Sequence, residues 1–188
     1  MTTVAIPEWT PQGILPPMDP RNPTAPQRSP YAISMLDLVM RFATSPVRHQ
    51  ILSGFVHYRA ALHAIGFVSG MQWLDGSFME HVELLEQRAP RDIDVVTFLH
   101  TPPGFALHPS NAGVLDHDEA KARFHVDSYF VELDELPAQT IVAQSAYWYS
   151  LWSHRRNTVW KGFLQIDLAP ATDLLARQWL DRYDSPQP

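Results

Sequence analysis

The sequence contains no cysteine, so disulfide bonds and thiolate metal sites are excluded. Charged residues are scarce, at 18% of the 188 positions, and the formal net charge is −6. A chain with this charge lacks the bulk electrostatic attraction that holds proteins on nucleic acid. No apolar run approaches the roughly 20 residues that span a bilayer, and the N-terminus has no basic segment followed by an apolar one. We therefore expect no membrane partner, no secretory signal and a cytoplasmic location.

Prolines are dense in residues 1–30, where they fix φ and remove amide donors, so neither a helix nor a central strand is expected there. The same stretch carries apolar side chains, among them Trp9, Ile14 and Leu15. The hydrophobic content of 45% and the length of the chain favour a single core. We therefore predict an extended Pro-rich arm over 1–30, docked through residues 13–15, and a single domain over 31–188.

The pattern of apolar residues predicts a mixture of helices and strands. Apolar residues recur at helical spacing over 31–42, 46–65 and 171–183. Thr44 or Ser45 can cap the second of these helices, Pro46 suits its first turn, and Gly66 is well placed to end it. Short apolar runs predict strands over 67–73, 92–99, 124–133 and 161–168, and residues 105–123 are expected to form loop or short helix. The fold class is therefore α+β, with a small mixed β-sheet flanked by helices.

Two aspartates, Asp92 and Asp94, open the second predicted strand, downstream of a Gly76-Ser77 pair and a helix predicted over 77–87. Alternate side chains of a strand share a face, so both carboxylates point to the same side. Two carboxylates in one space repel each other unless a cation lies between them, which suggests a hard divalent metal.

A glycine at a strand end permits a tight turn, and the helix after it directs free amides and its positive dipole end at a ligand. With the Ser77 hydroxyl, Gly76 would form a pocket for nucleotide phosphates. Asp127, in the third predicted strand and on the face of Tyr129, is a candidate for a second metal and for deprotonating an attacking hydroxyl. The chemistry would be in-line displacement at phosphorus, driven by positioning and charge neutralisation.

The Gly76-Ser77 turn, a helical insert, Asp92-Ile93-Asp94 and a later strand aspartate resemble the signature of the DNA polymerase β-type nucleotidyltransferase superfamily. The segments LDGSF, PRDIDVV, HVDSYFVEL and KGFLQIDL, with a Gly-Ile-Leu-Pro element at 13–16, resemble a group of small bacterial proteins within it. The resemblance implies a nucleotidyltransferase-like fold and an NTP substrate such as ATP. It implies two Mg²⁺ ions at Asp92, Asp94 and Asp127, with triphosphate at Gly76 and Ser77.

On this basis the chain is expected to move NMP from an NTP to a hydroxyl of an RNA, protein or small-molecule acceptor. Two other functions stay open. One is a catalytically degenerate nucleotide- or partner-binding module, in a toxin–antitoxin or phage-defence system, and the other is a phosphodiesterase-like hydrolase. The insert after Ser77 is longer than is usual for the superfamily, and its acids, Glu80, Glu83 and Glu86, would repel triphosphate if they faced the pocket.

A basic cluster, Arg155, Arg156 and Lys161, is a candidate contact for nucleotide phosphate or an RNA acceptor, or is a solvated turn. The surrounding aromatics favour core over base stacking; they are Tyr147, Trp148, Tyr149, Trp152 and Trp160. The histidines of one region match no metal-ligand spacing; they are His100, His108, His117 and His125. Asp75, just before the turn, lies either near the metals or in solvent.

Overall fold

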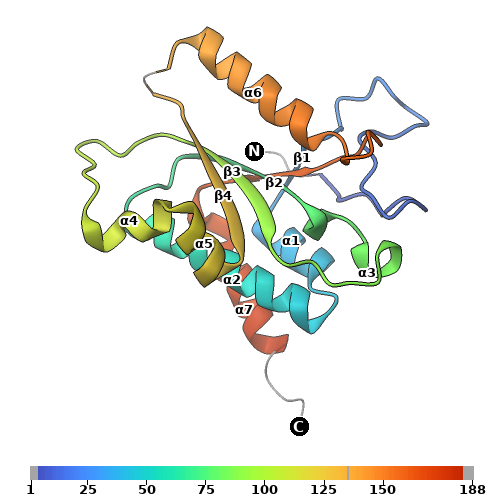
Figure 1. Cartoon of the computed structure of the whole chain (residues 1–188), viewed down its shortest axis with the longest axis horizontal. Coiled ribbons are helices and arrows are strands. Elements are labelled where there is room, and N and C mark those ends of the chain that lie inside the picture. Colours follow the sequence, from blue (N-terminus) through green and yellow to red (C-terminus); the bar gives the residue numbers. More distant parts are fainter. Residues whose placement is uncertain (1–3, 135, 184–188) are drawn as a thin grey trace.

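A five-stranded mixed sheet with helices on both faces forms the computed structural model, which describes residues 4–134 and 136–183 (Figure 1). Residues 1–3 of the predicted arm and 184–188 of the predicted domain lie outside the described residues. The strands are β1 (Tyr31–Ile33), β2 (Gly70–Asp75), β3 (Ile93–Leu99), β4 (Val126–Glu132) and β5 (Leu164–Asp167). Their order in the sheet is β1-β5-β2-β3-β4. The α+β class and the mixed sheet are therefore confirmed.

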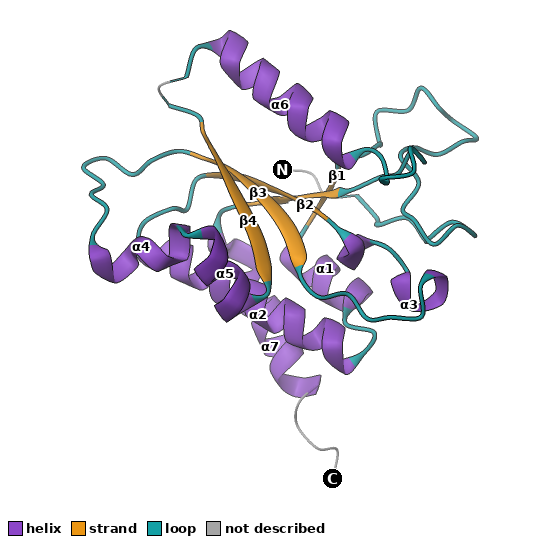
Figure 2. Cartoon of the chain, viewed as in Figure 1, coloured by secondary structure: helices purple, strands orange, loops and turns teal. Residues whose placement is uncertain are grey.

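The described chain contains seven α-helices and two short 3-10 turns. The helices are α1 (Met35–Phe42), α2 (Pro46–Ala64), α3 (Val82–Leu85), α4 (Pro109–Leu115), α5 (His117–Phe124), α6 (Ala138–Trp152) and α7 (Asp173–Tyr183). The larger core lies between one face of the sheet and α1, α2, α5 and α7 (Figure 2). A smaller aromatic core lies between the other face and α6. None of the helices described is both long and apolar enough to cross a membrane.

Helix α2 begins and ends where the sequence predicts. The Ser45 side chain accepts a hydrogen bond from the amide of Arg48, and Pro46 occupies the first turn. Gly66 follows the helix with φ of 97°, a conformation that glycine adopts without steric cost.

The helix predicted over 31–42 is wrong in its first turn, because Tyr31–Ile33 forms strand β1, parallel to β5. Pairing at the sheet edge overrides the helical spacing there. Ser34 then starts α1 with a capping box, in which it accepts from the amide of Asp37 and the Asp37 carboxylate accepts from the amide of Ser34.

The continuous helix predicted over 77–87 is also wrong. Residues Ser77–Met79 make a single 3-10 turn, Glu80 is extended, and the four residues of α3 follow. The fully buried guanidinium of Arg48 binds the carbonyls of Phe78 and Glu80 at 2.7 and 2.6 Å, and the amide of His81 donates to Gly13. These tertiary hydrogen bonds occupy groups that an unbroken helix would pair internally.

Helix α6 was not predicted, and the reason lies in its composition. Residues 138–152 carry no charged side chain, so no polar stripe marks the solvent face. Trp148 and Trp152 are buried against the sheet, whereas Tyr147 is 58% exposed. The expectation of core therefore holds for Trp148 and Trp152, whereas Tyr149 is half-buried and Trp160, like Tyr147, is exposed.

Residues 4–30 contain neither helix nor strand, only turns and an isolated bridge between Met18 and Arg28. Ile14 and Leu15 are nonetheless buried, and the carbonyl of Leu15 accepts from the amide of Gly162. This stretch therefore packs along the domain at the predicted place.

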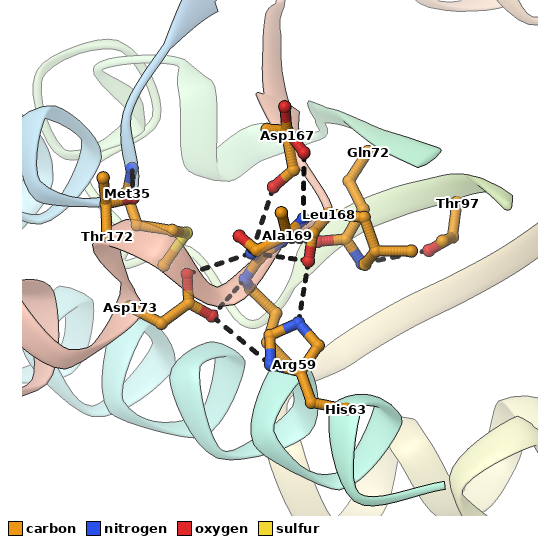
Figure 3. Close-up of polar contacts among 10 residues, drawn as sticks. All are labelled: Met35, Arg59, His63, Gln72, Thr97, Asp167, Leu168, Ala169, Thr172 and Asp173. Atoms are coloured by element: carbon orange, nitrogen blue, oxygen red, sulfur yellow. Dashed lines mark hydrogen bonds and ion pairs between the residues drawn. The ribbon is translucent and has the colours of Figure 1, made fainter. Parts of the chain in front are cut away.

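Arg59, fully buried in α2, ties the start of α7 to the sheet (Figure 3). It forms a bidentate ion pair with Asp173, at 2.7 and 3.0 Å, and donates to Oε1 of Gln72 in β2 at 2.6 Å. The remaining donor capacity goes to the carbonyls of Asp167 and Leu168 at the end of β5. Such a buried cation is tolerated because each of its charges and donors has a partner.

Candidate functional site

Three aspartates stand in a row across β2, β3 and β4, at the end of β2 and the starts of β3 and β4. Asp75 at the end of β2 is the register partner of Asp94 in β3, and Asp94 is the register partner of Asp127 in β4. Register partners share a face, so the three carboxylates lie side by side. Asp92, just before β3, falls by alternation on the same face. The predicted grouping of Asp92, Asp94 and Asp127 is therefore present, and Asp75 joins it.

The turn that follows β2 lies against this row. Gly76 has φ of 84°, and a Cβ on it would lie 2.7 Å from Cγ of Asp94 and 2.8 Å from each carboxylate oxygen. No side chain fits in that space, so glycine is required both by conformation and by the closeness of the carboxylate. Ser77 follows, half-buried, in the 3-10 turn. The predicted Gly-Ser turn thus adjoins the aspartates, although the long helix that was to follow it is absent.

The carboxylate of Asp94 has no hydrogen bond or ion pair with any other described residue. Burial raises its pKa to about 7, and the negative charges of Asp75, Asp127 and Asp92 add to the rise. A carboxyl group so placed gains by taking up a proton or by contacting a cation.

Lys121, near the end of α5, supplies positive charge to the other two predicted ligands. Its Nζ lies 2.7 Å from Oδ2 of Asp127 and 3.0 Å from Oδ2 of Asp92. The hydrogen bond to Asp127 raises the pKa of the lysine above its usual value, so the group is an ammonium ion. On the other side of Asp127, Nε2 of His117 lies 3.3 Å from Oδ1 without hydrogen-bond alignment, and Oδ1 is buried with no hydrogen-bond partner.

Asp75 is neutralised by a second lysine. Nζ of Lys161 lies 2.7 and 2.9 Å from its two carboxylate oxygens and 3.2 Å from Oε1 of Glu80. Burial alone would lower the pKa of Lys161, but the two carboxylates outweigh it and raise the pKa. Asp75 is therefore neither in solvent nor free for a metal.

The acids of the insert do not face an open pocket. Arg155 pairs with Glu80 at 3.0 Å and with Glu86 at 2.8 Å, and Arg48 pairs with Glu83 at 2.6 Å. The repulsion of triphosphate that the sequence suggests is thus removed by internal ion pairs.

The same ion pairs determine which of the predicted phosphate contacts still have an unpaired positive charge. Lys161 is buried and Arg155 is paired with two glutamates, so both already hold carboxylates. Arg156 is exposed beside them. Of the three basic candidates, Arg156 is the one with its charge turned to solvent.

Sequence reasoning missed Lys121, His117 and the pairing of Asp75 with Lys161. Neither Lys121 nor His117 belongs to a motif, because both reach Asp127 from a separate helix. The aspartate–lysine pair spans a separation of 86 residues, over which no sequence pattern carries information.

The donor set fits a hard divalent cation, because carboxylate oxygens are the ligands that Mg²⁺ takes. The observation that supports the fit is the buried Oδ1 of Asp127, which makes no hydrogen bond and has only Nε2 of His117 near it, beside the unpaired carboxylate of Asp94. Within the described residues, however, no group of three or more histidine or acidic side chains is already arranged to hold a metal ion. Lys121 lies within the cluster instead and holds Asp92 and Asp127 by one oxygen each.

The raised pKa of Asp94 predicts that the fold loses stability as the pH rises. The unfolded chain releases this proton near pH 4 and the folded chain near pH 7, so the folded state binds more protons between them. We expect the free energy of unfolding to fall by about 2 kcal/mol between about pH 5 and pH 8, as measured by urea denaturation with EDTA present.

Asp94→Asn removes this titrating group. The difference between wild type and variant in the pH dependence of the free energy of unfolding therefore isolates the contribution of Asp94. His63 acts in the opposite sense, because burial lowers its pKa, but it is common to both proteins. Identical pH profiles for the two proteins would show that Asp94 titrates normally.

A family model matches residues 7–167, and its description is a family of unknown function (DUF6932). No curated protein and no solved structure matches the chain. The matched segment includes all five strands, the row of aspartates and Lys121, and it stops before α7. Because the family description names no activity, function has to be argued from the site.

Proposed function

The chain belongs to a family of unknown function (DUF6932), and we propose from the geometry of its site that it is a Mg²⁺-dependent nucleotidyltransferase. The observation that carries the proposal is the row of Asp94 and Asp127 across β3 and β4, with Asp92 beside it and Gly76 in contact with it. The proposed reaction moves NMP from an NTP to a hydroxyl of an RNA, protein or small-molecule acceptor.

The order of these groups along the chain supports the resemblance to the polymerase β-type superfamily. In this chain a strand, the Gly-Ser turn, an antiparallel strand that begins after Asp92 and contains Asp94, and a parallel strand that contains Asp127 follow one another, which is the order of the motifs in the resemblance. In the superfamily the turn holds triphosphate, the paired aspartates hold metal and the third acid assists the acceptor hydroxyl. Carried over, these roles fall to Gly76 and Ser77, to Asp92 and Asp94, and to Asp127.

The chemistry requires positioning and charge more than covalent participation. When bound, Mg²⁺ neutralises phosphate oxygens, and the residues that would hold it are Asp94 and Asp127, with Asp92 beside them. Asp127 accepts the proton of the acceptor hydroxyl while the oxygen of that hydroxyl forms a bond to the α-phosphorus. The bond between that phosphorus and the pyrophosphate oxygen breaks, and pyrophosphate leaves with the bonding electrons. Arg156 is free to contact phosphate at the surface.

One observation favours a second candidate, a nucleotide- or partner-binding module without turnover. Lys121 already contacts one oxygen each of Asp92 and Asp127 and balances one of their two negative charges, which leaves less charge for a metal ion to balance. Such a module would bind NTP without transferring NMP.

The two candidates are separated by incubating the chain with each NTP, Mg²⁺ and total RNA or protein. Label at the α-phosphorus should enter a macromolecule, whereas the same NTP labelled at the γ-phosphorus should leave it unlabelled. Entry of the γ-label would identify a kinase, and free NMP alone would identify a hydrolase. NTP binding with no transfer to RNA, protein or small hydroxyl compounds would favour the module and reject the transferase.

A further inference from the structure

The ammonium group of Lys121 lies within the carboxylate cluster and is part of the site. It contacts one oxygen of Asp127 in β4 and one oxygen of Asp92, which leads into β3. An ammonium group that bridges the two strand starts in this way occupies oxygens that could otherwise hold a metal ion. A divalent ion held by both Asp92 and Asp127 would have to compete with the lysine for these oxygens.

Charge balance limits how many metal ions can share the site with this lysine. Asp75 is excluded from the balance because Lys161 neutralises it. Asp92, Asp94 and Asp127 carry three negative charges when ionised, Lys121 returns one positive charge, and the imidazole of His117 beside Asp127 adds none in its neutral form. The two negative charges that remain equal the charge of one divalent ion.

The groups that Lys121 leaves free identify where that ion belongs. Asp94 has no hydrogen-bond or ion-pair partner among the described residues, and only burial and neighbouring charges act on its carboxylate. Oδ1 of Asp127 is buried without a hydrogen bond, although Nε2 of His117 lies 3.3 Å from it. Asp94 and Asp127 are register partners on neighbouring strands. One divalent ion between them satisfies both, whereas a second ion would have to displace the ammonium group.

Lys121 is not needed to anchor α5, which is the other role that an ion pair at this place could have. Asp116 caps the helix through the amide of Glu119, Ala120 is buried beneath it, and the carbonyl of Phe124 packs on Gly54 of α2. The Lys121 side chain is 45% exposed, and ion pairs this exposed contribute little to stability.

We propose that Lys121 is a built-in cation that takes the place of the second metal ion, so that the site binds a single divalent ion at Asp94 and Asp127. This replaces the two ions that the superfamily resemblance implies. The inference rests on the proposed function only in treating these carboxylates as a metal site. The expected role of the lysine is to hold Asp92 and Asp127 at a fixed separation and to supply charge that does not depend on metal concentration.

The test counts bound Mn²⁺ by electron paramagnetic resonance of the free ion, with competition by Mg²⁺ to show that both ions use the same site. Wild type should bind one Mn²⁺ per chain. Lys121→Gln should bind a second, or bind the first at least about tenfold more tightly, because a like charge close to the metal is removed. Lys121→Met checks that this effect does not depend on the replacement.

Two variants serve as matched controls. Lys121→Arg keeps the charge and should bind one ion, as wild type does. Arg123→Gln removes a cation from the same helix whose contact is with Glu119 and not with the aspartates, and it should leave Mn²⁺ binding unchanged.

Each other outcome is decisive. Two ions on wild type, or identical binding by wild type and Lys121→Gln, would overturn the role of Lys121 while leaving a metal site in place. Binding to Lys121→Gln alone would overturn the single-ion assignment. Failure of wild type, Lys121→Gln and Lys121→Met to bind Mn²⁺ would overturn the proposed function itself.

Discussion

Asp94→Asn is expected to reduce nucleotide transfer by a factor of about 1,000 or more, an effect of the size seen when one group that stabilises transition-state charge is removed. Asparagine is nearly isosteric with aspartate, so the turn at Gly76 and the register with Asp127 are retained. What is lost is a negative charge at the centre of the proposed metal site. The measurement is the initial rate of transfer of α-labelled NMP at saturating Mg²⁺.

The same substitution should make the fold more stable, which separates loss of chemistry from loss of structure. The carboxylate of Asp94 is buried among other negative charges, and its neutral replacement removes that repulsion. We expect the free energy of unfolding at about pH 8 to rise by about 2 kcal/mol in EDTA. Gain of stability together with loss of activity is typical of functional sites.

Asp118→Asn provides the matched control, because Asp118 is an exposed aspartate on α5, the helix that carries Lys121. It should retain full transfer and wild-type stability. Full activity in Asp94→Asn would reject the proposed chemistry, and lower stability would reject the electrostatic description of the site.

Arg59→Met is expected to give the largest loss of stability, about 3–5 kcal/mol in the free energy of unfolding, because it leaves a buried charge without its partner. The side chain of Asp173 is mostly buried, and Arg59 is its bidentate partner. The carbonyls of Asp167 and Leu168 also lose a donor. Urea denaturation followed by circular dichroism measures the effect.

Arg21→Met is the control for the loss of an arginine as such. Arg21 makes the same kind of bidentate contact with Asp19, but its side chain is 89% exposed. Exposed pairs contribute about 0–1 kcal/mol, so this variant should unfold close to wild type. Equal losses in the two variants would show that burial of Arg59 does not control its contribution.

Features that depend on neighbouring residues could be predicted from the sequence, and features that depend on contacts between distant residues could not. Helix α2 could be predicted to its ends because Ser45, Pro46 and Gly66 are local signals. The face shared by Asp92 and Asp94 follows from strand alternation alone. The segment after Ser77 could not be predicted, because the side chain of Arg48, distant in sequence, binds its carbonyls and interrupts the helix.

The groups that can carry the chemistry are identifiable in the sequence: a Gly-Ser turn, two aspartates in alternation and a third in the next strand. Which of their charges are already balanced depends on the fold. Lys161 neutralises Asp75, and Lys121 bridges Asp92 and Asp127, leaving Asp94 unpaired. The physical reason is that alternation and capping act between near neighbours in the chain. Coulomb interactions act through space and depend on which distant side chains the fold brings within a few ångströms.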